Sequence, residues 1–310
     1  MISIKWLLLA ILFFVPGNSK LLAQNYFVSN LYHNLVFSNP AYALYTDFST
    51  VHLNYRNQWP SSTQYTSYGA AGFYVVENLN SSFGAIVNYD NEYQGTFTRT
   101  AIGGNYAYKM QTGHRSHLLF GLQAYYNLAS ANYSRLVFEN PAAAVPANQQ
   151  SSYTSISSGI GLLLNEEHFI GFSVLNLLPT ATNLSEEIRL QVSYRGLIQP
   201  RGYYNDLQYE PLVNISSNLI KTEAYYGMSV VYSGLKGGLI LRQNMFRLNT
   251  LIILLGISFE NYDIVYTNDI NLSGVVSVNP KMAAHEVTFL AKFKYKARSK
   301  RKGAIKCPDI

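Results

Sequence analysis

Short segments in which apolar and polar residues alternate recur along almost the whole chain. Such alternation runs from Ile188 to Arg195, from Leu207 to Ser216 and from Val287 to Tyr295. Strict alternation places successive side chains on opposite faces of a β-strand. The chain is therefore predicted to be all-β, with one apolar and one polar face on each strand.

The number of these segments favours a transmembrane antiparallel β-barrel. About 14 strands are expected, an even number typical of a single-chain bacterial barrel with a lipid-facing apolar side and a polar lumen. The predicted barrel covers residues 47–296 as one domain. Its expected strands span residues 48–57, 67–77, 82–91, 96–109, 117–125, 152–164, 168–175, 187–197, 207–216, 223–233, 236–244, 249–259, 261–268 and 286–296.

Composition agrees with a membrane barrel and argues against a nucleic-acid-binding protein. Only 13% of the residues are charged, against roughly 25% in soluble domains. The 26 Tyr and 16 Phe suit the aromatic girdles of a transmembrane barrel. The net charge of +6 is concentrated after residue 295, so the rest of the chain is close to neutral and no basic stripe for nucleic acid is expected.

The regions outside the barrel indicate export. Lys5, the apolar run Trp6–Val15 and a cleavage point after Ala23 predict a secretory signal peptide over residues 1–23. Residues 24–46 are expected to be an ordered lead-in rather than a strand, and residues 297–310 a basic periplasmic tail. The predicted location is the outer membrane, in contact with its lipid and with both termini periplasmic.

Loop lengths and unusual strands add two expectations. The longest connections, about residues 126–151, 176–186 and 269–285, all follow odd-numbered strands, as expected for extracellular loops. Residues 249–259 are apolar on both faces, and 67–77 carry small residues on both. Apolar or small inward residues predict a filled lumen rather than an open aqueous pore. Pro211 predicts a bulge or an unpaired position within its strand.

Several short words along the chain are more specific than its composition. They include Ser38–Ala43 (SNPAYA), Tyr55–Trp59 (YRNQW) and the pair His285-Glu286 before the last strand. A further word is the ending Arg301–Pro308 (RKGAIKCP). In order and spacing these words resemble the PorP/SprF family of the type IX secretion system of Bacteroidota, although Leu44 stands where the family usually has Gly.

The resemblance implies a non-enzymatic outer-membrane barrel that serves type IX export, surface attachment or gliding. It implies a secreted cargo protein with a type IX C-terminal domain as one partner. Periplasmic lipoproteins and ring components of the same system are implied as others. The residues that carry the resemblance are Asn39, Pro40, Ala41, Tyr42, Tyr55, Arg56, Gln58, Trp59, His285 and Glu286.

Elementary chemistry assigns roles to some of these residues. Asn39-Pro40 is a turn dipeptide, and Pro40 is expected to lead the chain into the first strand. Trp59 is expected at the outer interface, where an indole gains burial while its N–H stays wet. Arg56 should face the lumen, with Asp90 or Glu92 as its candidate partner.

Two interpretations of the basic tail are open. Lys300, Arg301, Lys302 and Lys306 either dock on an acidic partner or anionic lipid, or are a solvated terminus. Cys307, the only cysteine, is either without a role or forms a contact between proteins.

Catalysis has little support in the sequence. It contains no Gly-x-Ser-x-Gly elbow, Gly-rich phosphate loop or His-Glu-x-x-His motif. We therefore expect no enzymatic activity, no cofactor and no metal. Two alternatives stay open: a porin or hydrophobic-ligand transporter, and an outer-membrane enzyme such as a lipase or protease barrel.

Overall fold

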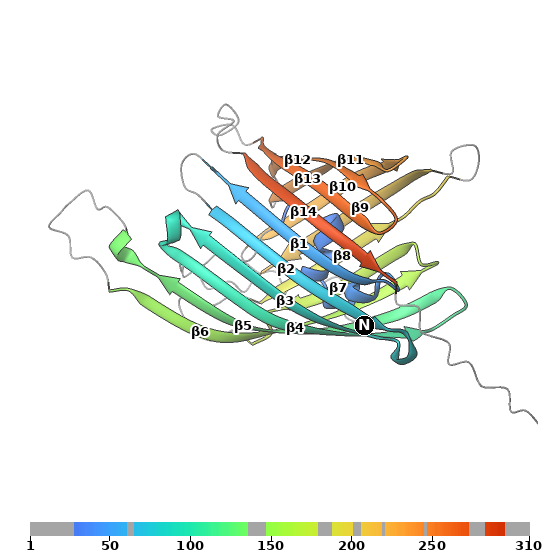
Figure 1. The fold of residues 1–310 in the computed structure, drawn as a ribbon, viewed down its shortest axis with the longest axis horizontal. Helices are drawn as coiled ribbons and strands as arrows, with labels where there is room; N and C mark the ends of the chain where they lie inside the picture. The colour runs from blue at the N-terminus through green and yellow to red at the C-terminus, as the bar shows by residue number, and fades with distance from the viewer. Residues whose placement is uncertain are drawn as a thin grey trace, which may run out of the picture.

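The protein forms a closed antiparallel β-barrel. The computed structural model describes residues 28–60, 65–135, 147–178, 188–200, 206–218, 221–244, 247–272 and 283–294. Within these ranges every strand pairs with its neighbours in sequence, and the first strand pairs with the last (Figure 1). The strands are β1 Ser49–Gln58, β2 Tyr65–Val76, β3 Ser81–Glu92, β4 Phe97–Gln111, β5 Ser116–Ala131, β6 Gln149–Leu164, β7 His168–Leu175, β8 Arg189–Gly196, β9 Leu207–Ser217, β10 Thr222–Tyr232, β11 Leu235–Asn244, β12 Arg247–Ser258, β13 Tyr262–Asn271 and β14 Ala284–Phe293.

The predicted fold class is confirmed, and the strand bounds shift by a few residues. The largest shift is in β5, which was expected to end at residue 125 but continues to Ala131 in register with Gln149 of β6. The hairpin continues because apolar and polar residues keep alternating there, with Tyr126 and Leu128 exposed and Asn127 buried.

Connections of very different length lie at the two ends of the barrel. Residues 132–148, 176–188 and 272–283 join odd-numbered strands to the next strand, at what we call the long-loop end. The other end is closed by tight turns such as 165–167 and 233–234, apart from the connection 197–206, and is called the short-turn end. This matches the predicted asymmetry of loop lengths.

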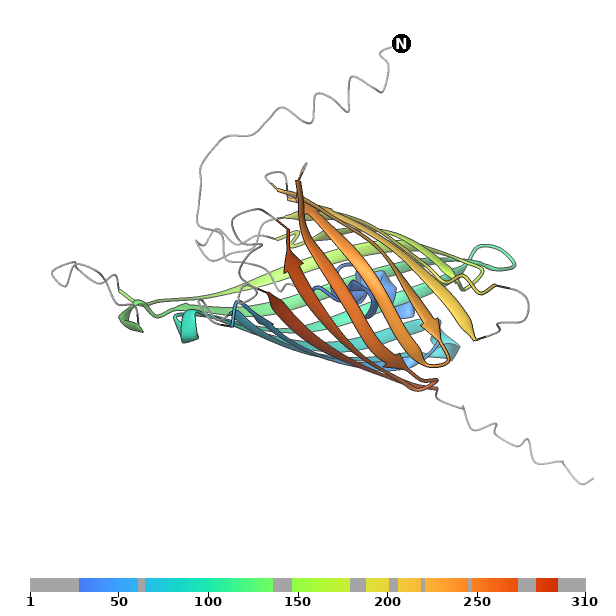
Figure 2. The same cartoon turned by 90° about the horizontal axis from the view of Figure 1, so that it is seen from above.

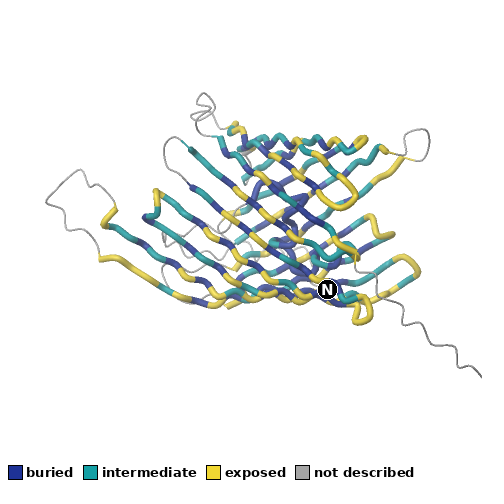
Figure 3. The backbone as a smooth tube through the Cα atoms, in the orientation of Figure 1, coloured by how far each residue is buried: buried dark blue, intermediate teal, exposed yellow. Residues whose placement is uncertain are grey.

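The two faces of the wall differ as the alternation predicts. Leu122, Leu239 and Leu255 on the outer face are 55%, 54% and 59% exposed, which suits contact with lipid. Polar residues such as Asn54, Gln123 and Asn214 are buried on the inner face. Buried and exposed positions alternate most regularly along strands such as β2 and β6 (Figure 3).

Pro211 marks a gap in the strand ladder. The pairing between β8 and β9 stops at Arg195 and Leu212, immediately beside Pro211, and resumes in a single bridge between Ile198 and Tyr209. On the other side β9 pairs with β10 without interruption. Pro211 has no N–H to donate, and Pro211 and Glu210 are both left unpaired on the β8 side, which is the kind of interruption that was expected.

The described part of the lead-in lies inside the barrel (Figure 2). It forms three short helices: α2 Leu31–Asn34, η2 Leu35–Phe37 and η3 Pro40–Leu44. No helix among the residues that the structure describes is long and apolar enough to cross a membrane. We call residues 28–45 the plug. The lead-in is not a strand, as predicted, but its place in the lumen could not be read from the sequence.

The plug runs along the lumen from one end toward the other. Ser29 contacts Glu286 and Asp269, which lie near the long-loop ends of their strands. Tyr45 donates to the carbonyl of Glu167 in the turn between β6 and β7, at the short-turn end. The predicted periplasmic placement of both termini concerns residues outside the described ranges and stays a prediction.

Candidate functional site

Asn39 and Pro40 begin the helix that fills the short-turn half of the lumen. Asn39 has an extended backbone, and its Oδ1 accepts a hydrogen bond from the Ala41 N–H at 3.0 Å. Pro40 occupies the first helical position, where its missing N–H costs nothing. Pro40 was expected to lead the chain into the first strand, but β1 begins only at Ser49. The dipeptide instead starts a helix inside the barrel.

Asn39 also fastens this helix to the wall. Its Nδ2 donates to the carbonyl oxygens of Ile160 on β6 at 3.1 Å and Phe172 on β7 at 3.4 Å. Gly121 lies against the plug backbone at Pro40 and Ala41, where a Cβ atom would overlap both. The helix cap and wall contacts of Asn39, together with the absence of a side chain at Gly121, thus fix the position of η3.

An apolar cluster surrounds η2 and η3. Tyr42 stacks on Tyr45 with ring centroids 4.8 Å apart and meets the edge of Phe169 at 5.1 Å. Ala71 and Phe73 of β2 belong to the same cluster, which accounts for the small and apolar residues on the inner face of that strand. The buried members of the cluster are Leu35, Val36, Ala41, Tyr42, Leu44, Ala71, Phe73, Val75, Ile86, Ala107, Leu119, Leu163 and Phe169.

A second apolar cluster surrounds α2 on the opposite wall. Ile252 and Leu254 of β12, the strand that is apolar on both faces, face the lumen there and are fully buried. Its members are Val28, Leu31, Tyr32, Leu212, Tyr225, Ile240, Ile252, Leu254 and Val265. The prediction of a filled lumen is therefore confirmed where the two clusters lie, and the chain's own plug occupies these parts of the lumen.

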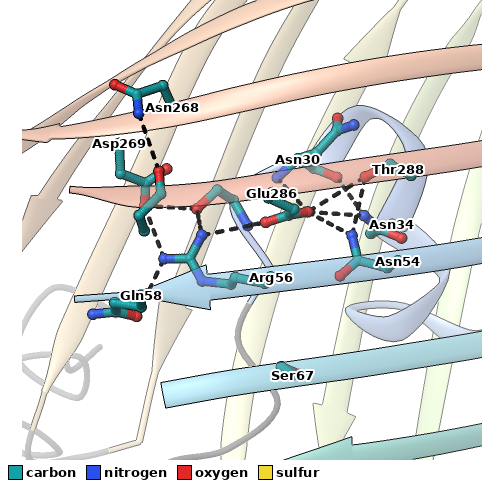
Figure 4. A network of polar contacts seen from close by, with 12 residues as sticks. Asn30, Asn34, Asn54, Arg56, Gln58, Ser67, Asn268, Asp269, Glu286 and Thr288 are labelled. Carbon is teal, nitrogen blue, oxygen red and sulfur yellow. Dashed lines mark hydrogen bonds and ion pairs between the residues drawn. The ribbon is translucent and has the colours of Figure 1, made fainter. Parts of the chain in front are cut away.

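A polar network, called here the clamp, holds the start of the plug against the barrel seam (Figure 4). Glu286 of β14 is fully buried at its centre. Its Oε2 accepts from the Ser29 N–H at 2.6 Å, and its Oε1 accepts from the Asn30 N–H at 3.2 Å and from Asn54 Nδ2 at 2.7 Å. The clamp comprises Ser29, Asn30, Asn34, Asn54, Arg56, Asp269 and Glu286.

Arg56 supplies the positive charge of the clamp. Its Nη2 lies 2.9 Å from Asp269 Oδ2 and its Nη1 lies 3.3 Å from Glu286 Oε2. The guanidinium also donates to Gln58 Oε1 at 3.2 Å and to the Ser29 hydroxyl. One side chain thus joins the first strand, the last two strands and the plug.

The predicted partners of Arg56 were wrong, although its inward direction is as expected. Asp90 instead accepts from Arg99 Nη2 at 2.9 Å and Nε at 3.2 Å. Asp90 lies on β3, two strands and therefore about 10 Å from β1. The direct neighbour of Arg56 across the seam is Glu286. Which strands become neighbours at the seam depends on closure of the barrel.

A second ionic cluster holds the other side of the plug. Glu210 lies 2.6 Å from Lys236 Nζ and 3.2 Å from Arg195 Nη2. Arg195 Nη1 donates to the Tyr32 carbonyl at 2.6 Å and to the Tyr42 hydroxyl. Burial raises the pKa of Tyr42 well above its usual range, so its phenol stays neutral and accepts this hydrogen bond.

The remaining residues of the sequence words lie on the outer face or outside the described ranges. Tyr55 is 40% exposed and packs against Tyr68. His285 Nδ1 lies 2.7 Å from the hydroxyl of Tyr266. Trp59 follows β1 at the long-loop end, and its backbone N–H donates to the carbonyl of Ala283 at 3.1 Å; the place of its side chain at the outer interface stays a prediction. Lys300, Arg301, Lys302, Lys306 and Cys307 lie outside the described residues.

Sequence reasoning missed several members of these networks. Asp269, Arg195, Glu210 and Lys236 are all buried or half-buried on the inner face. A usable signal existed, because only 13% of the chain is charged. A charged residue at an inward position of such a strand needs a partner in the lumen. Oppositely charged residues of the wall and polar groups of the plug supply that partner.

Together these features define a plugged β-barrel of the outer-membrane type. Solved structures with a similar fold include the toluene transporter TbuX of Ralstonia pickettii, with a TM-score of 0.55 at 9% identity, over 84% of this chain and 94% of that chain. A FadL homologue of Pseudomonas aeruginosa has a TM-score of 0.52 at 9% identity, over 85% and 94% of the two chains. At this identity the likeness concerns the fold alone.

The particular family follows from the sequence comparison. Residues 21–290 match the family of type IX secretion system membrane proteins PorP/SprF, and the chain belongs to that family. No curated protein matches the chain. The predicted resemblance is therefore confirmed at the level of the family.

Proposed function

We propose that this barrel is an accessory component of the type IX secretion and gliding system. It holds a secreted, adhesin-like cargo protein at the cell surface and contacts the periplasmic machinery from its other side. It turns over no substrate and uses no cofactor. Membership of a secretion-system family supports this proposal in outline, while the cargo and the contacts are the proposed part.

The observation that carries the proposal is the filled lumen. The plug buries two apolar clusters against opposite walls, and buried ion pairs fix it at Glu286 and at Arg195. A conduit needs a continuous water-filled or ligand-lined path, whereas an anchor needs a rigid platform. Side chains locked by packing and by charge suit a platform.

The asymmetry of the ends supports the proposed orientation of the contacts. The connections 132–148 and 272–283 join strands at the long-loop end, where a large cargo is proposed to be held. At the short-turn end Lys294 follows β14 and precedes the basic tail. Lys300, Arg301 and Lys302 are proposed to dock there on periplasmic lipoprotein or ring components.

A hydrophobic-ligand transporter is the second candidate. It is favoured by the fold shared with a toluene transporter and a FadL homologue. A transporter predicts ligand uptake or channel events in planar bilayers from the intact protein. An anchor predicts neither, because its plug has no reason to move.

Affinity purification of the tagged protein from native outer membranes tests the proposal. The expected result is recovery of a large secreted protein with a type IX C-terminal domain, together with periplasmic lipoproteins. A solitary barrel after extraction in mild detergent would overturn the anchoring function. Channel events or ligand uptake by the same preparation would then favour the transporter.

A further inference from the structure

A polar chamber lies in the lumen between the plug and the long-loop end. It encloses a cavity of about 100 Å³ that is open to solvent on one side. Val28 and Phe37 of the plug form part of its wall, and the rest comes from the long-loop halves of β3 to β10.

Six of the residues that line the chamber carry carboxamide side chains. Asn88, Gln123, Gln191 and Asn214 reach it from four different strands and are each at least nine-tenths buried. Each has one polar atom with no hydrogen-bond partner among the described residues: Asn88 Oδ1, Gln123 Nε2, Gln191 Oε1 and Asn214 Oδ1. The terminal torsion of Asn and Gln is broad, so these atoms can turn into the chamber at little cost.

The chemistry of the wall selects against strongly charged and against apolar ligands. Three charged residues line the chamber: Arg99 is already bound to Asp90, Glu223 is paired with Lys221 at 2.6 Å, and Arg189 also has an interaction partner. A charged ligand would therefore meet little free opposite charge from these groups. An apolar ligand would seal the orphaned carboxamide atoms away from water without a partner, which is unfavourable. The matching ligand is neutral and carries both donors and acceptors.

Among such ligands the wall favours a peptide over a sugar. Sugar sites commonly offer an aromatic face on which a ring can stack, but the aromatics here are already used. Tyr225 is only 4% exposed and belongs to the cluster around α2, while Phe37 and Tyr125 pack against the cluster around η2 and η3. Carboxamides match the paired N–H and C=O groups of an extended main chain.

We propose that the chamber binds a weakly charged, extended polypeptide segment through the main-chain groups of that segment. This inference rests on the proposed anchoring function, because the segment would belong to the anchored secreted protein. The four carboxamides are the recognition groups. The plug forms the floor of the chamber and keeps the segment from passing through the barrel.

A double substitution tests whether the chamber recognises the secreted partner or whether other surfaces of the barrel hold it. Gln191→Met with Asn214→Leu keeps side-chain volume but removes the hydrogen-bonding groups. Recovery of the secreted partner with the tagged barrel should fall by about tenfold or more, since each lost hydrogen bond costs a severalfold change in affinity. The matched control is Asn244→Leu, whose carboxamide also has an orphaned oxygen but does not line the chamber.

The outcomes distinguish the two proposals. If the unsubstituted barrel recovers no partner, the anchoring function itself fails. If it recovers the partner and the double variant recovers as much, anchoring stands and the chamber inference is overturned. Heat-modifiable migration on gels of all variants checks that the barrels have folded.

Photo-crosslinking identifies the ligand class directly. Benzoylphenylalanine is incorporated at Leu175, which lines the chamber, and for comparison at Leu122 on the outer face. Irradiated cells should yield a polypeptide adduct at position 175 and not at position 122. A glycan adduct at 175, or crosslinks only to the barrel's own wall, would overturn the assignment of a peptide.

Discussion

Arg56 and Glu286 stand directly opposite each other where the first and last strands close the barrel, and their charged groups approach to 3.3 Å. Each belongs to one of the sequence words that resemble the family, although 230 positions separate them in the chain. The same Glu286 carboxylate also accepts hydrogen bonds from the first residues of the plug. Closure of the barrel and docking of the plug therefore share one buried charge.

Removing this charge should destabilise the protein strongly. Glu286→Leu removes one acidic partner of the buried Arg56, and losing one member of a buried pair costs about 3–5 kcal/mol. Urea unfolding of the barrel in phospholipid vesicles measures the loss. The exposed Glu77→Ala should change stability by less than about 0.5 kcal/mol. A cost as small for Glu286→Leu would contradict the role of the clamp.

Asn39 is expected to stabilise η3 through two separable sets of contacts, the helix cap and the donations to the wall. Asn39→Ala loses the helix cap and both donations to the wall, and the cap alone is worth about 1 kcal/mol. Asn39→Asp keeps the acceptor for the Ala41 N–H but loses the donors to Ile160 and Phe172. Hydrogen exchange of the backbone amides of residues 41–45 should therefore quicken most for the Ala variant and less for the Asp variant. Equal rates in both variants would mean that the wall contacts dominate.

Gly121 should tolerate no side chain. A Cβ at this position overlaps the backbone of Pro40 and Ala41, whereas a Cβ at Gly72 meets nothing within 4 Å. Gly121→Ala is expected to displace η3 and to expose the plug to protease, at a cost of about 1–3 kcal/mol. Gly72→Ala serves as the matched control. Protection of the plug in both variants would show that η3 can shift without loss.

Deleting the plug should open a pore. Without residues 28–45 the inner wall retains polar residues around an unfilled lumen, so planar bilayers should record steady ion conductance. The intact protein should stay silent, as should a chain that lacks residues 297–310 instead. If the plug-deleted barrel is folded but also silent, the plug is not what closes the lumen.

The basic tail should act through its charge. Replacing Lys300, Arg301 and Lys302 by Gln should weaken co-purification of periplasmic lipoproteins while the barrel still folds. Lys221→Gln, an exposed lysine on the barrel, should have no such effect. The attraction should also fade as salt rises, because screening shortens the reach of exposed charges. Unchanged recovery at low and moderate salt would leave the tail as a solvated terminus.

Much of the architecture was accessible from the sequence. Alternation with a period of two sets which residues of a strand face lipid, so Leu122 and Asn214 could be assigned to opposite faces without coordinates. Loop lengths distinguished the two ends of the barrel. Neighbouring strands run in opposite directions, so alternate connections lie at the same end. The apolar inward residues of β2 and β12 already pointed to a filled lumen.

Tertiary structure alone decided what fills the lumen and which charges meet. Alternation states that Arg56 points inward, but its neighbour Glu286 is known only once β1 and β14 close the ring. Asn39-Pro40 was predicted as a turn from the sequence, yet the carbonyl partners of Asn39 on β6 and β7 lie more than 100 residues away. Local pattern sets the direction of a side chain, whereas closure of the barrel and burial of the plug choose its partners.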